Sequence, residues 1–415
     1  MSSAYALGRR EFLGLAAAVA GAAAFGSWAP GALASTDGGF GERLVPPGKL
    51  GVQQFAVRDA ITRLDGSAMG YLGGPNFPAD PTDLGPLVAL PGGFRAVFEY
   101  LASVGYKGFE FFSFSQGANG AITFEEIRQA LDATGLYAQG SHTGGLATMA
   151  NPVTRQQQID IARTLGHTMI GTAGDPVGGA AANLLANWEV AALQYNTVGA
   201  ALAAEGMRYY LHPEQNNFNF FSDPAHPELS RVHRIDWFTE HTDPSLVFFE
   251  PDTLHAFAGR ARFPDPVDGS LWDALGWFAA NSHRILAWHI KDGSRIVPQP
   301  PPPASPFTQT VARTPTFTDV IYVGEGSIGN GYPVDPDPAV VGFGKLFDEV
   351  VGQKGSRFYI AESDSSPGPA ADPGRSLRWA KISAEYLLGL HAGPKSGQST
   401  VSDEGALDSG AELVR

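Results

Sequence analysis

The 415-residue sequence contains no cysteine. A disulfide framework, a thiolate metal site and a catalytic thiol are therefore excluded, and any metal must be bound by histidine, aspartate or glutamate. Basic residues are scarce as well, because 28 lysines and arginines stand against 42 aspartates and glutamates, for a formal net charge of −14. They are scattered singly or in pairs, so we expect no surface that binds a phosphate backbone and no nucleic-acid partner.

Long apolar runs are absent except near the N-terminus, where one extends over residues 12–25. It follows Arg9-Arg10 and precedes an A-x-A sequence that ends at Ala34, which is the order of an export signal. The paired arginines indicate the twin-arginine type. The run is short and glycine-containing for a membrane-spanning anchor, the alternative interpretation. We expect residues 1–34 to be a signal peptide that engages the twin-arginine export machinery. Its removal would leave no stable membrane insertion, and the protein would act in the periplasm or extracellularly.

Beyond the signal, short apolar or aromatic runs alternate with helical patterns. Strands are expected at 50–57, 108–112, 136–141, 168–171, 207–212, 246–250, 285–290 and 357–361, and helices at 94–104, 123–134, 153–165, 185–205, 230–240, 271–281, 340–351 and 377–390. Strands that alternate with helices indicate parallel βαβ units. Eight units are the number that closes a (β/α)8 TIM barrel, and a doubly wound open sheet is the competing fold. We expect the barrel to occupy residues 35–392.

Three further segments stand outside the repeating pattern. Long insertions follow the first and seventh strands, at 59–93 and 293–339. Both would lie on the carboxyl-terminal face of the barrel, where active sites are built, as lids or as plain surface loops. Residues 393–415 are rich in serine, glycine and acids, which predicts a disordered acidic tail.

The ends of the last four strands carry histidines and carboxylates. They are His212 and Glu214 on the fifth, Glu250, Asp252 and His255 on the sixth, His289, Lys291 and Asp292 on the seventh, and Glu362 and Asp364 on the eighth. In a barrel these ends surround one opening. So many carboxylates would repel one another without a cation, and a divalent ion with mixed oxygen and nitrogen ligands resolves that repulsion. Each residue also has an ordinary explanation, as a helix cap or a hydrogen-bonded histidine.

Several aromatic residues lie near these strand ends: Phe112, Phe114, Phe218, Phe220 and Trp288. Aromatic rings there either stack on a sugar or pack in the core. The sequence leaves both explanations open.

Five segments carry a resemblance to a known family: LHPEQNNFNF at 211–220, EPDTLHAFAG at 250–259, WHIKDG at 288–293, GEGSIG at 324–329 and AESD at 361–364. In order and spacing they resemble the sugar phosphate isomerase/epimerase superfamily, the xylose-isomerase-like TIM barrels. The resemblance extends from about residue 50 to about residue 390. It implies a barrel with a divalent-metal site that acts on a small-molecule carbohydrate.

The resemblance also implies roles for individual residues. The metal ligands correspond to Glu214, Asp252, His289 and Glu362, and the substrate-binding residues to His255, Lys291, His142, Glu110 and His212. The fifth strand departs from the family, because many relatives have H-N-H where this chain has His212-Pro213-Glu214. His212 is therefore the rival of Glu214 as the fifth-strand ligand. One divalent ion is expected, and mixed ligation leaves Mn²⁺, Zn²⁺, Co²⁺ and Mg²⁺ open.

In this superfamily the metal binds two neighbouring substrate oxygens, which acidifies the adjacent C–H bond and stabilises an enediolate. The resemblance implies that Glu214 and Glu362 move the proton. An exported enzyme meets few sugar phosphates, so we expect a metal-dependent isomerase or epimerase that acts on a free sugar or a keto-sugar. A keto-glycoside lyase with the same site and a non-catalytic carbohydrate-binding protein are the alternatives. A metal-dependent nuclease conflicts with the acidic charge.

Overall fold

The computed structural model describes residues 43–62, 92–143, 145–293, 320–324, 326, 328–329, 342–352, 357–363, 366 and 374–390. The expected signal peptide and acidic tail lie outside the described residues, as do most of the two expected insertions. Among the described helices, none combines the length and the hydropathy that a bilayer crossing requires.

Eight parallel strands form the centre of the fold. They are β1 (Leu50–Gln53), β2 (Gly108–Phe111), β3 (Tyr137–Ser141), β4 (Met169–Ala173), β5 (Arg208–His212), β6 (Val247–Phe249), β7 (Ala287–Ile290) and β10 (Phe358–Ala361). Their order is β6-β5-β4-β3-β2-β1-β10-β7. Parallel bridges from Phe249 to Ile285 and from Asp252 to His289 join the two edges, so the ring is nearly closed. The expected (β/α)8 TIM barrel is confirmed.

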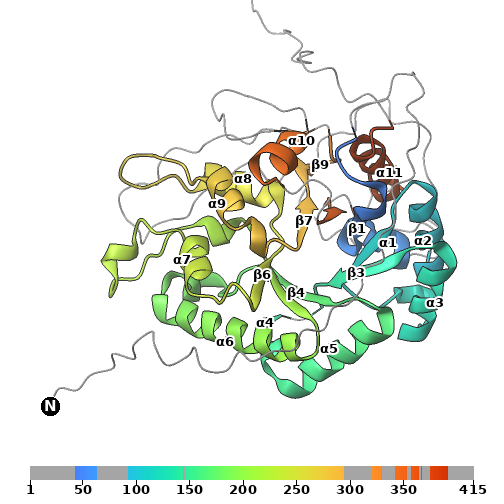
Figure 1. The fold of residues 1–415 in the computed structure, drawn as a ribbon, viewed down its shortest axis with the longest axis horizontal. Helices are drawn as coiled ribbons and strands as arrows, with labels where there is room; N and C mark the ends of the chain where they lie inside the picture. Colours follow the sequence, from blue (N-terminus) through green and yellow to red (C-terminus); the bar gives the residue numbers. More distant parts are fainter. Residues whose placement is uncertain are drawn as a thin grey trace, which may run out of the picture. The chain divides into compact units, whose positions relative to one another are not determined.

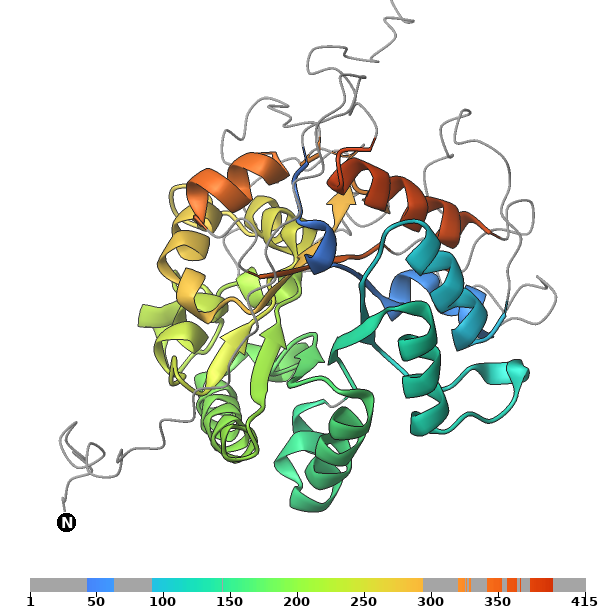
Figure 2. The ribbon, with the colours of Figure 1, turned by 45° about the vertical axis from the view of Figure 1, so that its right-hand side comes forward.

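Helices surround these strands, as Figures 1 and 2 show. They are α1 (Arg58–Thr62), α2 (Phe94–Ser103), α3 (Phe124–Thr134), α4 (Leu146–Ala150), α5 (Pro152–Leu165), α6 (Leu185–Ala204), α7 (Arg234–Glu240), α8 (Thr253–Arg262), α9 (Ala274–Ala280), α10 (Phe343–Lys345) and α11 (Arg375–Leu387). Local sequence sets the ends of several of them. The Thr123 and Glu126 side chains form a capping box at the start of α3, and Gly135 ends that helix in the left-handed conformation.

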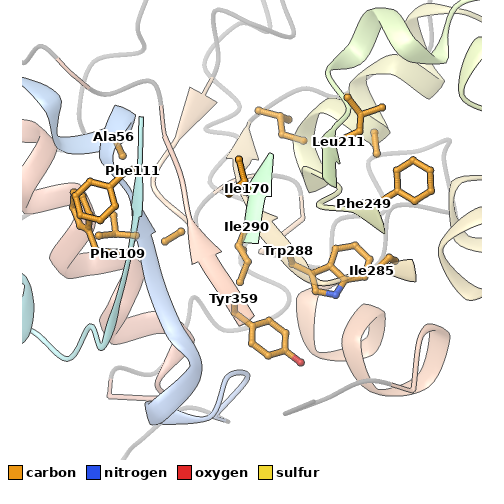
Figure 3. Close-up of a cluster of buried hydrophobic side chains, with 14 of the residues drawn as sticks. Ala56, Phe109, Phe111, Ile170, Leu211, Phe249, Ile285, Trp288, Ile290 and Tyr359 are labelled. Carbon is orange, nitrogen blue, oxygen red and sulfur yellow. The ribbon is translucent and has the colours of Figure 1, made fainter. Parts of the chain in front are cut away.

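Side chains along each strand alternate between the surrounding helices and the barrel interior. On β2, Phe109 packs against Phe98 of α2 with ring centroids 4.9 Å apart, whereas Glu110 meets His289 across the interior. On β7, the Trp288 ring packs against Phe278 of α9, and the close-up in Figure 3 shows it among the buried hydrophobic side chains. The alternation therefore places one polar side chain from each of these strands inside the barrel.

Several elements differ from the sequence expectation, and helices α1 and α4, for example, were not expected. The first strand ends at Gln53 rather than at residue 57, because the Gln53 side chain accepts a hydrogen bond from the Phe55 N–H and starts a 3-10 turn over Gln54–Val57. Helix α8 was not expected at all. Its N-cap is Asp252, whose Oδ1 accepts the His255 N–H at 2.8 Å. This helix carries His255 directly behind the end of β6.

Asp292 attaches a later segment of the chain, residues 320–329 in part, to the barrel. Strand β8 (Asp292–Gly293) pairs antiparallel with β9 (Val320–Ile321), and the buried Asp292 carboxylate accepts N–H groups from Gly293, Gly324, Gly326, Ile328 and Gly329 at 2.9–3.1 Å. A Cβ on Gly326 would lie 2.3 Å from Asp292 Oδ1, which explains the glycine there. The G-x-G-x-x-G spacing of GEGSIG thus surrounds a carboxylate of the protein itself.

Candidate metal centre

Four buried side chains converge at the carboxyl-terminal end of the barrel. They are His212 from the end of β5, Asp252 after β6, His289 on β7 and Glu362 after β10, and one ligand atom of each lies within 4.8 Å of the others. Asp252, His289 and Glu362 are three of the four metal ligands that the sequence suggested. The ends of four strands therefore place ligand atoms around one volume that a single cation can occupy.

Asp252 has the geometry of a pre-positioned ligand. Its Oδ1 is occupied by the α8 cap, whereas its Oδ2 is buried and has no hydrogen-bond partner among the described residues. A buried carboxylate oxygen without a partner is costly in a folded protein. A cation at this position would satisfy Oδ2, while the helix cap would hold the carboxylate in one orientation. This observation supports the fit between the donor set and a divalent metal.

His289 is the centre of the group. Its Nδ1 lies 2.7 Å from Glu362 Oε2, and its Nε2 lies 2.7 Å from Glu110 Oε2 and 3.1 Å from Glu250 Oε2. Burial alone would lower the pKa of His289, but the carboxylates of Glu250, Glu110 and Glu362 raise it well above its ordinary value. The three carboxylates thus favour a positive charge at this position, which a protonated imidazole or a cation would supply.

Glu110 and His142 also face this interior. The Tyr210 hydroxyl donates to Glu110 Oε1, and the His142 Nε2 lies 2.6 Å from Glu250 Oε2 and 3.3 Å from Glu110 Oε2. Burial raises the pKa of Glu110, and the nearby Glu250 carboxylate adds to this shift. Both residues thus lie where the sequence expected groups that face the substrate.

Lys291 and His255 stand beside the eighth-strand glutamate. Lys291 Nζ lies 3.6 Å from Glu362 Oε1 and 3.5 Å from His255 Nε2. Burial, with the Lys291 charge next, lowers the pKa of His255 well below its ordinary value, so this ring is neutral at pH 7. A neutral imidazole and an ammonium group at this place can bind substrate hydroxyl or carbonyl oxygens.

Glu214 is the one expected ligand that does not join the others. It belongs to neither of the two groups of metal-ligating side chains that the described residues form, and it is half-buried in the segment between β5 and the following 3-10 turn. Its rival His212 belongs to both groups. Burial lowers the pKa of His212 well below its ordinary value, which leaves a neutral ring with a lone pair for a cation.

The sequence listed Glu250 only as one of the strand-end carboxylates, without an individual role, and it missed Tyr210; the structure places both in this cluster. Glu250 is fully buried and contacts both His142 and His289, although it could be read as a helix cap in the sequence. Tyr210 lies two residues before His212 on β5 and so faces the same side. The period-2 alternation back from His212 was the available signal for Tyr210.

Most of the aromatic residues near the strand ends pack in the hydrophobic core. Trp288, Phe218 and Phe220 are buried in the core, whereas Phe112 is 43 % exposed and packs edge-on against Phe55 at 5.2 Å between centroids. Only Phe112 keeps the surface that stacking on a sugar ring needs among these four.

Comparison with known proteins identifies the fold family. Residues 98–382 match the sequence profile of the family described as xylose isomerase-like TIM barrel. The chain belongs to this family. Xylose isomerase-like barrels are generally enzymes, with sugar isomerases and epimerases among them. A search of curated proteins finds no significant match to the sequence.

One solved structure agrees with this assignment at the level of the fold, and two further ones are reported for their similarity alone. A sugar phosphate isomerase/epimerase from Parabacteroides distasonis is 16 % identical, with a TM-score of 0.52 over 82 % of this xylose isomerase-like chain and 94 % of the other. The IOLI protein, solved with a zinc atom, is 10 % identical, with a TM-score of 0.49 over 83 % and 99 % of the two chains. A probable 3-DHS dehydratase from Bacillus anthracis is 12 % identical, with a TM-score of 0.47 over 82 % and 98 %.

Proposed function

We propose that this protein is a divalent-metal-dependent sugar isomerase or epimerase that acts on a free sugar or keto-sugar. The observation that carries the proposal is the convergence of His212, Asp252, His289 and Glu362 within 4.8 Å of one another in a buried interior. Membership of the xylose isomerase-like family and the fold shared with a sugar phosphate isomerase/epimerase support the same reaction class.

Asp252, His289 and Glu362 would hold the ion, with His212 as the ligand from the fifth strand. When bound, a divalent ion would polarise a substrate carbonyl and increase the acidity of the neighbouring C–H bond. Its identity among Mn²⁺, Zn²⁺, Co²⁺ and Mg²⁺ stays open, because two carboxylates and two imidazoles suit several of these ions.

Glu362 is our candidate for the group that moves the proton. Its Oε2 is fixed by His289 Nδ1 at 2.7 Å, and its Oε1 faces Lys291 Nζ at 3.6 Å. Burial alone would raise the pKa of Glu362, but the Lys291 and His289 charges hold it well below its usual range. The carboxylate is therefore in the ionised form that a general base requires, with Lys291 and His255 positioned to stabilise negative charge on a substrate oxygen.

Glu214 keeps the role of second proton carrier in this proposal, without a ligand role. An epimerase needs an acid and a base on opposite sides of the reacting carbon. Glu214 follows β5, and Glu362 follows β10; these strands are not neighbours in the barrel. The proposed substrate is an extracytoplasmic carbohydrate, and that part of the proposal depends on the expected twin-arginine signal.

A deuterium-exchange experiment tests the function. The metal-loaded protein is incubated in D₂O with a panel of keto-sugars, and NMR follows exchange at the carbon next to the carbonyl. We expect exchange with at least one sugar, and its loss after chelation and after Glu362→Gln. Sugar binding without exchange, in protein with stoichiometric metal, would favour a non-catalytic binding protein. Release of an aglycone from keto-glycosides would favour the lyase.

A further inference from the structure

The barrel closes between β6 and β7 through isolated backbone contacts. Among the described residues, the bridges across this edge are Phe249–Ile285 and Asp252–His289, and the His289 N–H donates to the Pro251 carbonyl oxygen at 3.1 Å. On its other side, β7 pairs with β10 along its whole length. The edge between β6 and β7 therefore has less backbone hydrogen bonding to fix its width than the edge between β7 and β10.

A threonine hydroxyl continues the contact across this edge beyond the backbone bridges. Thr253 is the first residue of α8 and is fully buried. Its hydroxyl donates to the Lys291 carbonyl oxygen at 2.7 Å and accepts the Lys291 N–H at 3.1 Å, and its Oγ1 lies 3.4 Å from the His289 carbonyl oxygen. One side chain thus binds both backbone groups of Lys291, as a neighbouring strand would.

This hydroxyl joins two segments that carry groups of the candidate site. On its own side of the edge, Asp252 directly precedes Thr253, and His255 follows two residues later. On the other side, His289 lies on β7 and Lys291 directly follows that strand. The hydroxyl therefore ties the start of α8, which carries two of these groups, to the end of β7, which carries the other two.

Two separations within the site depend on the width of this edge. Lys291 Nζ lies 3.5 Å from His255 Nε2, and the ligand atoms of Asp252 and His289 belong to one group within 4.8 Å. Without the hydroxyl, an apolar group would face the N–H and the carbonyl of Lys291. Buried backbone groups that lose a partner are costly, so the end of β7 would shift toward other partners. Such a shift would change both separations together.

We propose that Thr253 is a positioning residue, whose hydroxyl holds the start of α8 and the end of β7 at the separation that metal binding and proton transfer require. The inference rests on the proposed function and adds to it a residue that donates its proton to the backbone and not to metal or substrate. Loss of a group that orients metal ligands costs about 10–100-fold in affinity, and a displacement of about 1 Å can cost about 10²-fold in rate.

Thr253→Val and Thr253→Ser test this role. Valine keeps the branched shape and removes the hydroxyl, whereas serine keeps the hydroxyl. Competition with a chelating dye at pH 8 measures metal affinity, and deuterium exchange into a keto-sugar at saturating metal gives kcat and KM. We expect Thr253→Val to lower both metal affinity and kcat about 10–100-fold. KM should change less, because Lys291 and His255 would act on charge that develops in the transition state. Thr253→Ser should recover most of both losses.

Thr242→Val is the matched control for a purely structural effect. Thr242 is buried, and its hydroxyl donates to the Phe238 carbonyl oxygen at 2.8 Å and accepts from the Arg284 guanidinium at 2.7 Å. These contacts lie near the starts of β6 and β7, whereas the candidate site lies at their ends. We expect Thr242→Val to lower the melting temperature while it keeps wild-type metal affinity and kcat.

Wild-type metal affinity and kcat in Thr253→Val would overturn the positioning role and leave the proposed function intact, as would equal losses in Thr242→Val or no recovery in Thr253→Ser. If the wild type binds metal without exchange, the affinity comparison alone decides. A wild type that binds no metal would remove the proposed function and this role with it. Should Thr253→Val fail to fold, judged by its melting curve, Thr253→Ala replaces it with the same expected losses.

Discussion

Replacing Asp252 with asparagine separates the metal role of this residue from its structural role. Asn caps a helix about as well as Asp, so the hydrogen bond from the His255 N–H to the side-chain oxygen should survive. The lost feature is the anionic Oδ2, which is buried and has no hydrogen-bond partner among the described residues. Changes to residues that only support metal ligands cost about 10–100-fold in affinity. Loss of an anionic ligand should therefore lower the affinity for the proposed metal ion at least about 100-fold.

The assay is competition with a chelating dye at pH 8, with the melting temperature of the metal-free protein measured in parallel. Asp273→Asn is a matched control, because Asp273 caps α9 through the Gly276 N–H at 2.9 Å and belongs to neither ligating group. We expect wild-type affinity in this control and no loss of metal-free melting temperature in either variant. Asp252→Ala should in addition lose about 1 kcal/mol of stability through its cap. Unaltered affinity of Asp252→Asn would remove Asp252 from the ligand set.

Three further predictions concern the proton carrier, pH and the Asp292 contacts. Glu362→Gln should lower deuterium exchange by about 10²–10⁴-fold while retaining the fold and weaker metal binding, as NMR and elemental analysis would show; near-wild-type exchange would place the proton carrier elsewhere. Burial and the Glu362 charge raise the pKa of Asp252 to about 7 although Lys291 opposes them, so protons compete with metal below pH 7. Affinity measured by calorimetry should fall at least about tenfold between pH 8 and pH 6, and a flat profile would contradict the assignment. Asp292→Asn should destabilise the protein by about 3 kcal/mol in urea unfolding, because an amide nitrogen would face backbone N–H groups that now donate to a carboxylate.

The alternation of helix and strand patterns was enough to predict the barrel. The strands are short and apolar, and the helical patterns between them are long, so their types could be assigned without knowledge of tertiary contacts. Boundaries were less accurate. The first strand was expected to run through residue 57, but a Gln53 side chain that accepts its own neighbour's N–H ends it four residues earlier. That contact depends on the rotamer of the Gln53 side chain, which a hydropathy pattern cannot predict.

Strand-end position pointed to a wide set of histidines and carboxylates, and the family resemblance selected the expected ligands from that set. Three of these, Asp252, His289 and Glu362, lie together in the structure. The fifth strand remained ambiguous between His212 and Glu214, because this chain has His212-Pro213-Glu214 where many relatives have H-N-H. The structure places His212 with the others, through the β5 pairing that makes it an inward residue.

Glu250 illustrates a different limit. It directly follows β6, and Asp252 follows two residues later, so either could have been the ligand or the cap. The hydrogen bond from the His255 N–H shows that Asp252 is the residue that caps α8. Glu250 instead points toward His142, which follows a different strand. Contacts between strands that lie far apart in the chain are set by the barrel closure and cannot be read from local sequence.

The most direct test of the account is a crystal structure of the Mn²⁺-loaded protein with anomalous diffraction data. We predict an anomalous peak bonded to Asp252 Oδ2, His289 and Glu362 at the carboxyl-terminal end of the barrel. A fully loaded crystal with no peak between these three side chains would contradict the metal site, and with it the proposed reaction.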